Sequence, residues 1–410
     1  METVRVLELY SGIGGMHYAL KESGVPAEVV AAVDINTMAN QIYKHNFPDT
    51  PLWNKSIEGL TLEDFAGLSV DMVMMSPPCQ PFTRIGLQGD VSDPRTKSFL
   101  HILHLLPRLH RPPRFILLEN VKGFETSAAR DRLINTLTEC GYVFQEIMAS
   151  PTSVGIPNSR LRYFLIARRS AENMNIHTGS KVWDVCAQPA EDDLALVSKA
   201  ACSGTTPPEE KASHGLVLYK LETEMQLQRK TTQNSNPDVK QIQDFLEAGS
   251  QVNVEEYLLP PKTLLRYSLL LDIVQPTSRR SVCFTKGYGR YVEGTGSVLQ
   301  GCMDTEVQSV FTDLELLSEE DRLQRLMSLR LRYFTPREVA NLMCFPPCFS
   351  FPEHISTIQR YRVLGNSLNV LLVAKLVQLL FSIQPTHSCE NSSSAAPQPP
   401  EPRPGSAVDT

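Results

Sequence analysis

Residues 75–82 read Met-Ser-Pro-Pro-Cys-Gln-Pro-Phe, and the rest of the chain is interpreted from them. The run directly before this stretch, residues 71–75, is typical of a buried parallel strand. Two prolines then end the strand, because proline lacks an N–H for the sheet ladder and fixes φ at about −65°. Cys79 therefore lies just past the carboxyl end of a strand, where open α/β sheets bind their ligands. Most cysteines are small buried hydrophobic residues, but this placement favours a nucleophile.

Two further strands indicate a nucleotide-like ligand at the same edge. Residues 4–9 read as a strand that runs into a glycine-rich turn at 12–15, and a helical pattern follows. The turn lacks the third glycine of the dinucleotide fingerprint, which disfavours NAD. The next strand, 29–33, ends at Asp34, about twenty residues past the turn, where an acid can bind ribose hydroxyls. Together these features predict an adenosyl cofactor; the alternative is that Asp34 only caps the helix that starts near Thr37.

A second titratable group is predicted beside Cys79. Residues 115–118 read as another buried strand, and this strand ends in Glu119. Such a carboxylate can cap a helix or accept structural hydrogen bonds, but paired with an exposed cysteine it indicates a nucleophile and a general acid. Arg160 and Arg162 are two residues apart and would share one face of a strand. They are either solvated edge arginines or a fork that holds a carboxylate or a nucleobase carbonyl.

Composition limits the class of protein. With 410 residues, two domains are expected. A hydrophobic content of 42% and a charged content of 20% are typical of a soluble globular protein, and the net charge of −6 argues against a bulk binder of long nucleic acid. Nine cysteines without a secretory signal indicate thiols in a reducing compartment, so we expect a cytoplasmic protein, with the nucleus as a second location. The apolar run 370–374 is too short to span a membrane.

One stretch of the second half combines positive charge with aromatic side chains. It contains five basic residues and one acid: Arg266, Arg279, Arg280, Lys286, Arg290 and Asp272. Phe284, Tyr288 and Tyr291 are interleaved with these charges. The combination suits base stacking with phosphate contacts. The alternative is a glycine-rich hairpin whose charges arose by chance.

Together, these motifs resemble those of the cytosine carbon-5 methyltransferase family. The matching segments follow the family's order: 7–16, Asp34, 76–80, 119–121, 160–162 and 365–367. With Cys-Phe-Thr at 283–285, the chain most closely resembles the animal enzymes that look like DNA methyltransferases but modify transfer RNA. The resemblance implies an α/β fold, with a Rossmann-like S-adenosylmethionine-dependent methyltransferase sheet and a smaller target-recognition domain.

The resemblance also implies a domain organisation. Residues 1–169 would form the catalytic, S-adenosylmethionine-binding domain. Residues 170–334 would form the target-recognition domain, with a flexible polar insert at about 170–250. Residues 335–384 would return to the catalytic domain, and the Ser/Pro-rich residues 385–410 would be a disordered tail.

Site residues are carried over in the same way, with no metal among them. The S-adenosylmethionine pocket would be lined by Ile13, Gly14, Gly15, Asp34, Ile35, Ile57, Glu58, Ser76 and Ser367. Cys79 would attack carbon 6 of cytosine, Glu119 would protonate or hydrogen bond ring N3, and Arg160 and Arg162 would orient the base. Because the thiolate is the nucleophile, the site is expected to lower the pKa of Cys79. The family often has glutamine before the two arginines, whereas Asn158 and Ser159 stand there in this chain.

The substrate implied by the resemblance is cytosine-38 in the anticodon loop of tRNA, chiefly aspartate tRNA, with weak DNA binding as a secondary expectation. A DNA cytosine-5 methyltransferase is the first alternative, because the chemistry is the same on both polymers. The acidic net charge and a start directly at the first strand favour a compact RNA. The second alternative, a non-catalytic binder of RNA and S-adenosylmethionine, is disfavoured by the intact Cys79, Glu119 and Arg162. The residues carry no signal for an oligomeric state.

Overall fold

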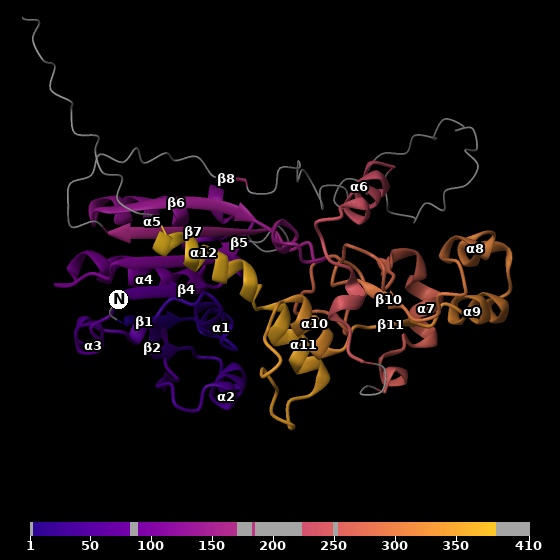
Figure 1. The fold of residues 1–410 in the computed structure, drawn as a ribbon, viewed down its shortest axis with the longest axis horizontal. Helices are drawn as coiled ribbons and strands as arrows, with labels where there is room; N and C mark the ends of the chain where they lie inside the picture. Colours follow the sequence, from indigo (N-terminus) through magenta and orange to yellow (C-terminus); the bar gives the residue numbers. More distant parts are fainter. Residues whose placement is uncertain (1–2, 83–88, 170–182, 185–223, 249–252, 383–410) are drawn as a thin grey trace, which may run out of the picture.

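An eight-stranded mixed sheet organises the first part of the chain, as Figure 1 shows. The computed structural model describes residues 3–82, 89–169, 183–184, 224–248 and 253–382. The strands are β1 (Val4–Leu9), β2 (Ala27–Val33), β3 (Leu52–Trp53), β4 (Met72–Met75), β5 (Phe115–Val121), β6 (Tyr142–Ala149), β7 (Arg162–Arg169) and β8 (Trp183–Asp184). Their order is β3-β2-β1-β4-β5-β7-β6-β8, and β7 is antiparallel to β5 and β6. Because β2, β1, β4 and β5 are mutually parallel, their carboxyl ends share one edge.

Helices cover both faces of this sheet. They are α1 (Gly15–Glu22), α2 (Thr37–Asn46), α3 (Leu62–Leu68), α4 (Lys97–Leu105), α5 (Ala128–Glu139) and α12 (Val370–Ser382). Successive residues of β1 alternate between two cores, because side chains alternate along a strand. Val6 belongs to the core with α1, α2 and α12, and Leu7 belongs to the core with α3, α4 and α5. Double coverage explains why the central strands are mostly apolar.

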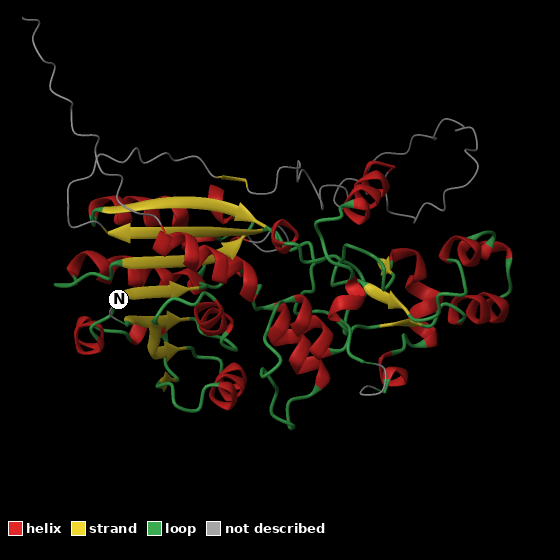
Figure 2. Ribbon diagram, viewed as in Figure 1, coloured by secondary structure: helices red, strands yellow, loops and turns green. Residues whose placement is uncertain are grey.

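A smaller body follows the sheet along the chain, and Figure 2 shows that it is built mainly of helices and loops. Its three-stranded sheet has the order β11-β10-β9, with β9 (Ile273–Val274), β10 (Val298–Gln300) and β11 (Leu331–Arg332). Helices α7 (Pro261–Tyr267), α8 (Val307–Phe311) and α9 (Glu319–Met327) complete it. Leu264, Phe311 and Leu326 pack in a core that is separate from both faces of the large sheet.

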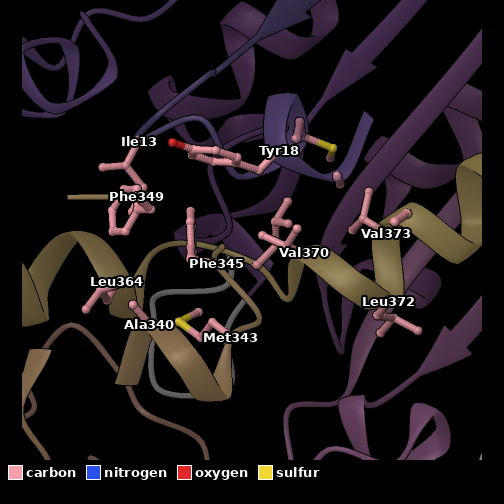
Figure 3. Packing of buried hydrophobic residues seen from close by; sticks show 14 of the residues in the cluster. Ile13, Tyr18, Ala340, Met343, Phe345, Phe349, Leu364, Val370, Leu372 and Val373 are labelled. Atoms are coloured by element: carbon pink, nitrogen blue, oxygen red, sulfur yellow. The ribbon is translucent and has the colours of Figure 1, made fainter. Parts of the chain in front are cut away.

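The end of the described chain returns to the large sheet. Helix α10 (Pro336–Leu342) begins with Thr335 as its N-cap and Pro336 at its first position, as the sequence indicates. Helix α11 (Thr357–Gly365) follows, and α12 then packs against α1 and β7. Figure 3 shows Val370 and Val373 of α12 in the same core as Tyr18 of α1.

The apolar character of α12 is explained by this packing. By length and composition alone, the helical stretch Thr357–Ser382 is long and apolar enough to cross a membrane, unlike the shorter run 370–374 considered from sequence. In the structure, however, 61% of its most apolar window is buried inside the protein. Core packing therefore accounts for its hydrophobicity.

The structure describes part of the expected flexible insert at about 170–250. Residues 170–182 and 185–223 and the expected tail at 385–410 lie outside the described residues. In contrast, the stretch 224–248 begins with helix α6 (Glu224–Ser235) and continues onto the protein core. Ile242 is fully buried, and the backbone N–H of Lys240 donates to Gly155 O at 3.0 Å. Buried apolar side chains therefore anchor the end of this segment, at Val239 and Ile242, whereas α6 itself has no buried residue.

A carboxyl group is buried in the middle of the large sheet. Glu8 of β1 is fully buried, and the hydroxyl of Tyr43 donates to its Oε2 at 2.8 Å. His17 Nδ1 lies 2.9 Å from the same hydroxyl, and the imidazole stacks on Phe47. Burial raises the pKa of Glu8 to about 8 and lowers the pKa of His17 to about 3. The group is therefore a neutral hydrogen-bonded cluster at neutral pH.

This cluster predicts a pH-dependent stability. Because the pKa of Glu8 is about 8 in the folded protein and 4.5 ordinarily, only the unfolded chain releases this proton between those pH values, so the Glu8 contribution to stability falls as pH rises. Glu8→Gln should raise the free energy of unfolding at pH 8 by roughly 4 kcal/mol relative to wild type, and by little at pH 4.5. Denaturant unfolding across this range measures the difference, with the exposed Glu28→Gln as control. Parallel pH profiles for wild type and Glu8→Gln would contradict the prediction.

Candidate active site

The loop that carries Cys79 is held at both ends. It leaves β4 at Met75 and passes through Pro77 and Pro78 into a single 3-10 turn. The amide of Phe82 donates to Cys79 O at 3.0 Å, and the Phe82 ring packs edge-on against Phe124. The Cys79 side chain is half-buried at the carboxyl edge of the sheet. The loop therefore presents the sulfur at this edge without burying it in the core.

Glu119 and Arg162 meet because of the register of two antiparallel strands. Glu119 of β5 lies opposite Phe164 of β7, and Val121 lies opposite Arg162. Glu119 and Arg162 are thus diagonal neighbours on the same face. The Arg162 Nε lies 3.5 Å from Glu119 Oε1, and both side chains are less than one-fifth exposed. The expectation that Glu119 emerges beside Cys79 is supported electrostatically, since its charge acts on the Cys79 thiol.

Arg160 is placed differently from the sequence expectation. β7 begins at Arg162, so Arg160 lies in the preceding loop rather than two places along one strand face. Its side chain is buried, and Nη1 donates to Phe284 O at 3.0 Å. Nη2 donates to Gly365 O at 3.1 Å and to Ser367 O. One guanidinium group therefore fastens the smaller body and the C-terminal segment to the large sheet.

The residues that replace the family's glutamine strengthen this junction. Asn158 Nδ2 donates to Ser281 Oγ and to Val282 O, each at 3.1 Å. The amide of Ser159 donates to Ser281 O at 2.8 Å. These contacts bring the segment that starts at Ser281 directly to the catalytic edge.

The predicted cofactor residues also gather at this edge. Asp34 Oδ2 accepts from Gly12 N at 2.8 Å, and Oδ1 accepts from Asn36 N at 2.8 Å. Asn36, not Asp34, is the N-cap of α2, so the capping alternative for Asp34 is wrong. Ser76 Oγ donates to Tyr10 O at 3.4 Å. Gly15 approaches Ser367 so closely that an added Cβ would lie 3.0 Å from its Oγ.

These surroundings fit an adenosyl group. Ile35, beside Asp34, is 68% exposed, which leaves an apolar surface next to a carboxylate that still has unused lone pairs. The hydroxyl of Ser11 is buried without a hydrogen-bond partner among the described residues. Gly14, at φ 86°, packs on Phe47 and has no room for a side chain. A turn that exposes its backbone to a ligand requires such a glycine.

The remaining predicted residues contribute in other ways. Ile13 and Ile57 are buried, each in one of the two cores of the large sheet. Glu58 is exposed in the single 3-10 turn that starts at Ile57, and its charge acts on Tyr10. Any contact of Ile13 or Ile57 with a ligand would therefore come mainly from the backbone.

Comparison with known proteins agrees with this arrangement. A family model described as C-5 cytosine-specific DNA methylase matches residues 4–382. The chain belongs to this family. The match includes the Cys79 loop, both arginines, the smaller body and α12.

Relatives of this methylase extend over almost all of its length. A human tRNA (cytosine(38)-C(5))-methyltransferase is 55% identical over 401 residues, which cover 93% of this chain and 100% of the relative. A Dictyostelium discoideum DNA (cytosine-5)-methyltransferase is 39% identical, with 93% and 95% covered. The crystal structure of a Spodoptera frugiperda DNMT2 mutant superposes with a TM-score of 0.72 at 39% identity, covering 93% of this chain and 100% of that one. These likenesses confirm the expected methyltransferase fold.

The pKa of the Cys79 thiol is shifted in the direction opposite to the expected one. Burial raises the pKa of Cys79, and the Glu119 carboxylate raises it further, whereas Arg162 and Arg160 offset only part of the effect. The expectation that the site lowers this pKa is therefore wrong for the ligand-free protein. Burial also raises the pKa of Glu119, against the opposing effect of the two arginines. A raised pKa favours a carboxyl group that keeps its proton, as a general acid requires.

Cys283 is the functional candidate that the sequence reasoning missed. Its Sγ lies 3.2 Å from Arg160 Nη1 and 3.8 Å from Arg162 Nη2. Although burial alone would raise it, these guanidinium groups lower the pKa of Cys283. The only sequence signal was its place in the Cys-Phe-Thr segment, because the contact joins positions more than a hundred residues apart.

The opposite shifts of the two thiols predict different pH dependences of alkylation. Only the thiolate reacts, so iodoacetamide should modify Cys283 with a lower pH midpoint than Cys79. Glu119→Gln should move the Cys79 midpoint to lower pH, since it removes a negative charge that raises the Cys79 pKa. Peptide mass spectrometry resolves the two sites, and Glu139→Gln on the exposed end of α5 is the control. A lower midpoint for Cys79 than for Cys283 would refute this electrostatic assignment.

Proposed function

We propose that this chain methylates carbon 5 of cytosine-38 in the anticodon loop of tRNA, chiefly aspartate tRNA, with S-adenosylmethionine as methyl donor. The observation that carries the proposal is the meeting of Cys79, Glu119 and Arg162 beside the Asp34–Gly12 contact at one sheet edge. The full-length human relative bears the name of this tRNA reaction. DNA cytosine-5 methylation is the second candidate, favoured by the name of the Dictyostelium relative.

The cofactor would be held by groups from four separate segments. Asp34 would accept hydrogen bonds from the ribose hydroxyls, and Ile35 would cover the adenine. The turn at 12–15 would expose backbone to the ligand, with Ser76 and Ser367 at its borders. When bound, S-adenosylmethionine supplies an electrophilic methyl group.

The chain's own residues would activate the cytosine. Carbon 5 is a poor nucleophile until Cys79 Sγ bonds to carbon 6 and saturates the ring double bond. Glu119 would place a proton at ring N3, where negative charge develops as the sulfur attacks. After carbon 5 has taken up the methyl group, a base removes the proton from carbon 5, N3 returns its proton to Glu119 and the Cys79 sulfur leaves, which restores the ring.

The charges around Cys79 link these events. With Glu119 protonated, its share in raising the pKa of Cys79 is lost, while Arg162 and Arg160 still favour the thiolate. Protonated Glu119, which cytosine N3 needs as its proton donor, therefore also favours the thiolate form of Cys79. Arg160 acts as a positioning residue, since its terminal nitrogens bond to Phe284 O, Gly365 O and Ser367 O.

The substrate class is tested by methyl transfer from labelled S-adenosylmethionine to total tRNA and to duplex DNA under the same conditions. We expect label in tRNA at cytosine-38 and little in DNA. Cys79→Ala should abolish transfer and leave S-adenosylmethionine binding nearly intact, because the thiol contacts the base rather than the cofactor. Preferred transfer to duplex DNA would replace this proposal by its alternative, and an equal loss of cofactor affinity in Cys79→Ala would refute the role of the thiol.

Glu119→Gln should lower kcat by at least about 100-fold, the usual scale of general acid catalysis, because glutamine keeps the size but cannot donate an acidic proton. Single-turnover transfer to tRNA measures this step. S-adenosylmethionine affinity should stay unchanged, and Glu139→Gln should behave as wild type. An unaltered kcat would exclude Glu119 as the acid.

A further inference from the structure

A loop of the smaller body leaves the active site directly. It starts at Cys283, whose sulfur contacts Arg160, and it closes on itself where Thr285 N donates to Thr295 O at 2.9 Å. Its backbone packs so tightly on Gly365 that an added Cβ there would lie 2.2 Å from Lys286 N. Residues 285–295 are therefore fixed beside the junction that Arg160 makes with Ser367.

Two of the three rings and two of the five cations predicted to contact nucleic acid turn out to be structural. Phe284 and Tyr288 are each 2% exposed, and the Tyr288 hydroxyl donates to Ser297 O at 2.7 Å and accepts from Phe334 N at 2.9 Å. Stacking on a base is excluded for these two rings. Arg280 pairs with Asp272, and Arg279 donates to Val239 O. These contacts hold the smaller body together.

Four side chains of the loop remain exposed, namely Lys286, Arg290, Tyr291 and the single acid Glu293. The Tyr291 ring is 59% exposed, although its backbone is fixed, with N donating to Gly287 O at 2.9 Å and O accepting from Thr295 Oγ1 at 2.7 Å. The Arg290 guanidinium lies 5.4 Å from the centre of this ring. Within the described part of the chain, neither Lys286 nor Arg290 forms an ion pair. The loop thus presents a preset aromatic ring beside the Arg290 cation, and a second exposed cation, Lys286, lies in the same loop.

We propose that Tyr291 is a stacking platform for an unpaired RNA base next to the target cytosine, and that Lys286 and Arg290 bind the adjoining phosphates. The inference rests on the proposed RNA substrate and extends it to a specific contact. An aromatic ring stacks on any base, and neighbouring cations neutralise the backbone. Eight residues separate Tyr291 from Cys283, so their Cα atoms are at most about 29 Å apart, and the closure of the loop shortens that distance.

The platform favours a loop over a duplex. Bases in a hairpin loop are already unstacked in part and are free to leave their neighbours, whereas those of a duplex are stacked and paired. Displacing a second base of a duplex would add to the cost of extracting the target, which is a few kcal/mol in itself. Tyr291 would therefore add to the preference for an anticodon loop over DNA.

The test uses the full chain and a synthetic anticodon stem-loop RNA that contains the target cytosine. Tyr291→Ala should raise KM and the RNA Kd by about 5- to 100-fold, the scale of one base–aromatic stack, with kcat and S-adenosylmethionine affinity little changed. Tyr291→Phe should restore most of the lost affinity, because it keeps the ring. Leu316→Ala, which truncates another exposed side chain of the smaller body, is the matched control.

Abasic nucleotides on either side of the target identify the stacked base. Removing that base should weaken binding to wild type as much as Tyr291→Ala does, and it should weaken binding to Tyr291→Ala no further. Equal sensitivity of both proteins to every abasic position, or unchanged RNA affinity in Tyr291→Ala, would overturn the platform.

Binding measured with Cys79→Ala as the background separates the two proposals. If wild type transfers no methyl group to RNA, the proposed function fails. If wild type methylates RNA but truncation of Tyr291 in the Cys79→Ala background leaves RNA affinity unchanged, only the platform fails.

Discussion

The candidate site depends on the hydrogen bonds of one guanidinium group. Arg160 donates to the carbonyls of Phe284, Gly365 and Ser367. Phe284 belongs to the smaller body, and the other two belong to the C-terminal segment. Hydrogen bonds from a charged donor are among the stronger ones, and a buried carbonyl left without a donor is costly. The same group faces the Cys283 sulfur. A single side chain thus sets both the geometry and part of the electrostatics of the catalytic edge.

The electrostatics of the edge follow from the unequal distribution of its charges. Cys79 lies near both Glu119 and the arginines, so burial and the carboxylate prevail and the thiol keeps its proton. Cys283 contacts the two guanidinium groups directly, and they outweigh burial. The site therefore raises the pKa of Cys79 and lowers the pKa of Cys283. The balance at Cys79 changes with the proton on Glu119, which couples nucleophile and acid.

Sequence reasoning located the parts of the site that follow from local patterns. Strand ends determine where Cys79 and Asp34 emerge, and strands are readable from apolar runs bounded by prolines, glycines and acids. The expected strand end at Glu119 is wrong, because β5 continues to Val121 and Glu119 is paired within it. Long-range contacts were not readable in this way. The carbonyl partners of Arg160, the lowered pKa of Cys283 and the inward turn of Tyr288 depend on how distant segments pack. The buried Ile242 similarly anchors a stretch whose polar composition suggests disorder.

The packing of α12 on α1 has a consequence for biosynthesis. Gln378 donates to Ser23 O across 355 positions, so the part of one sheet face that α12 covers stays exposed until residues 370–382 have been made. Domains generally fold as units while the chain is made, but this one must wait for its last helix. A premature stop codon before α12 would therefore leave an exposed apolar surface that promotes aggregation.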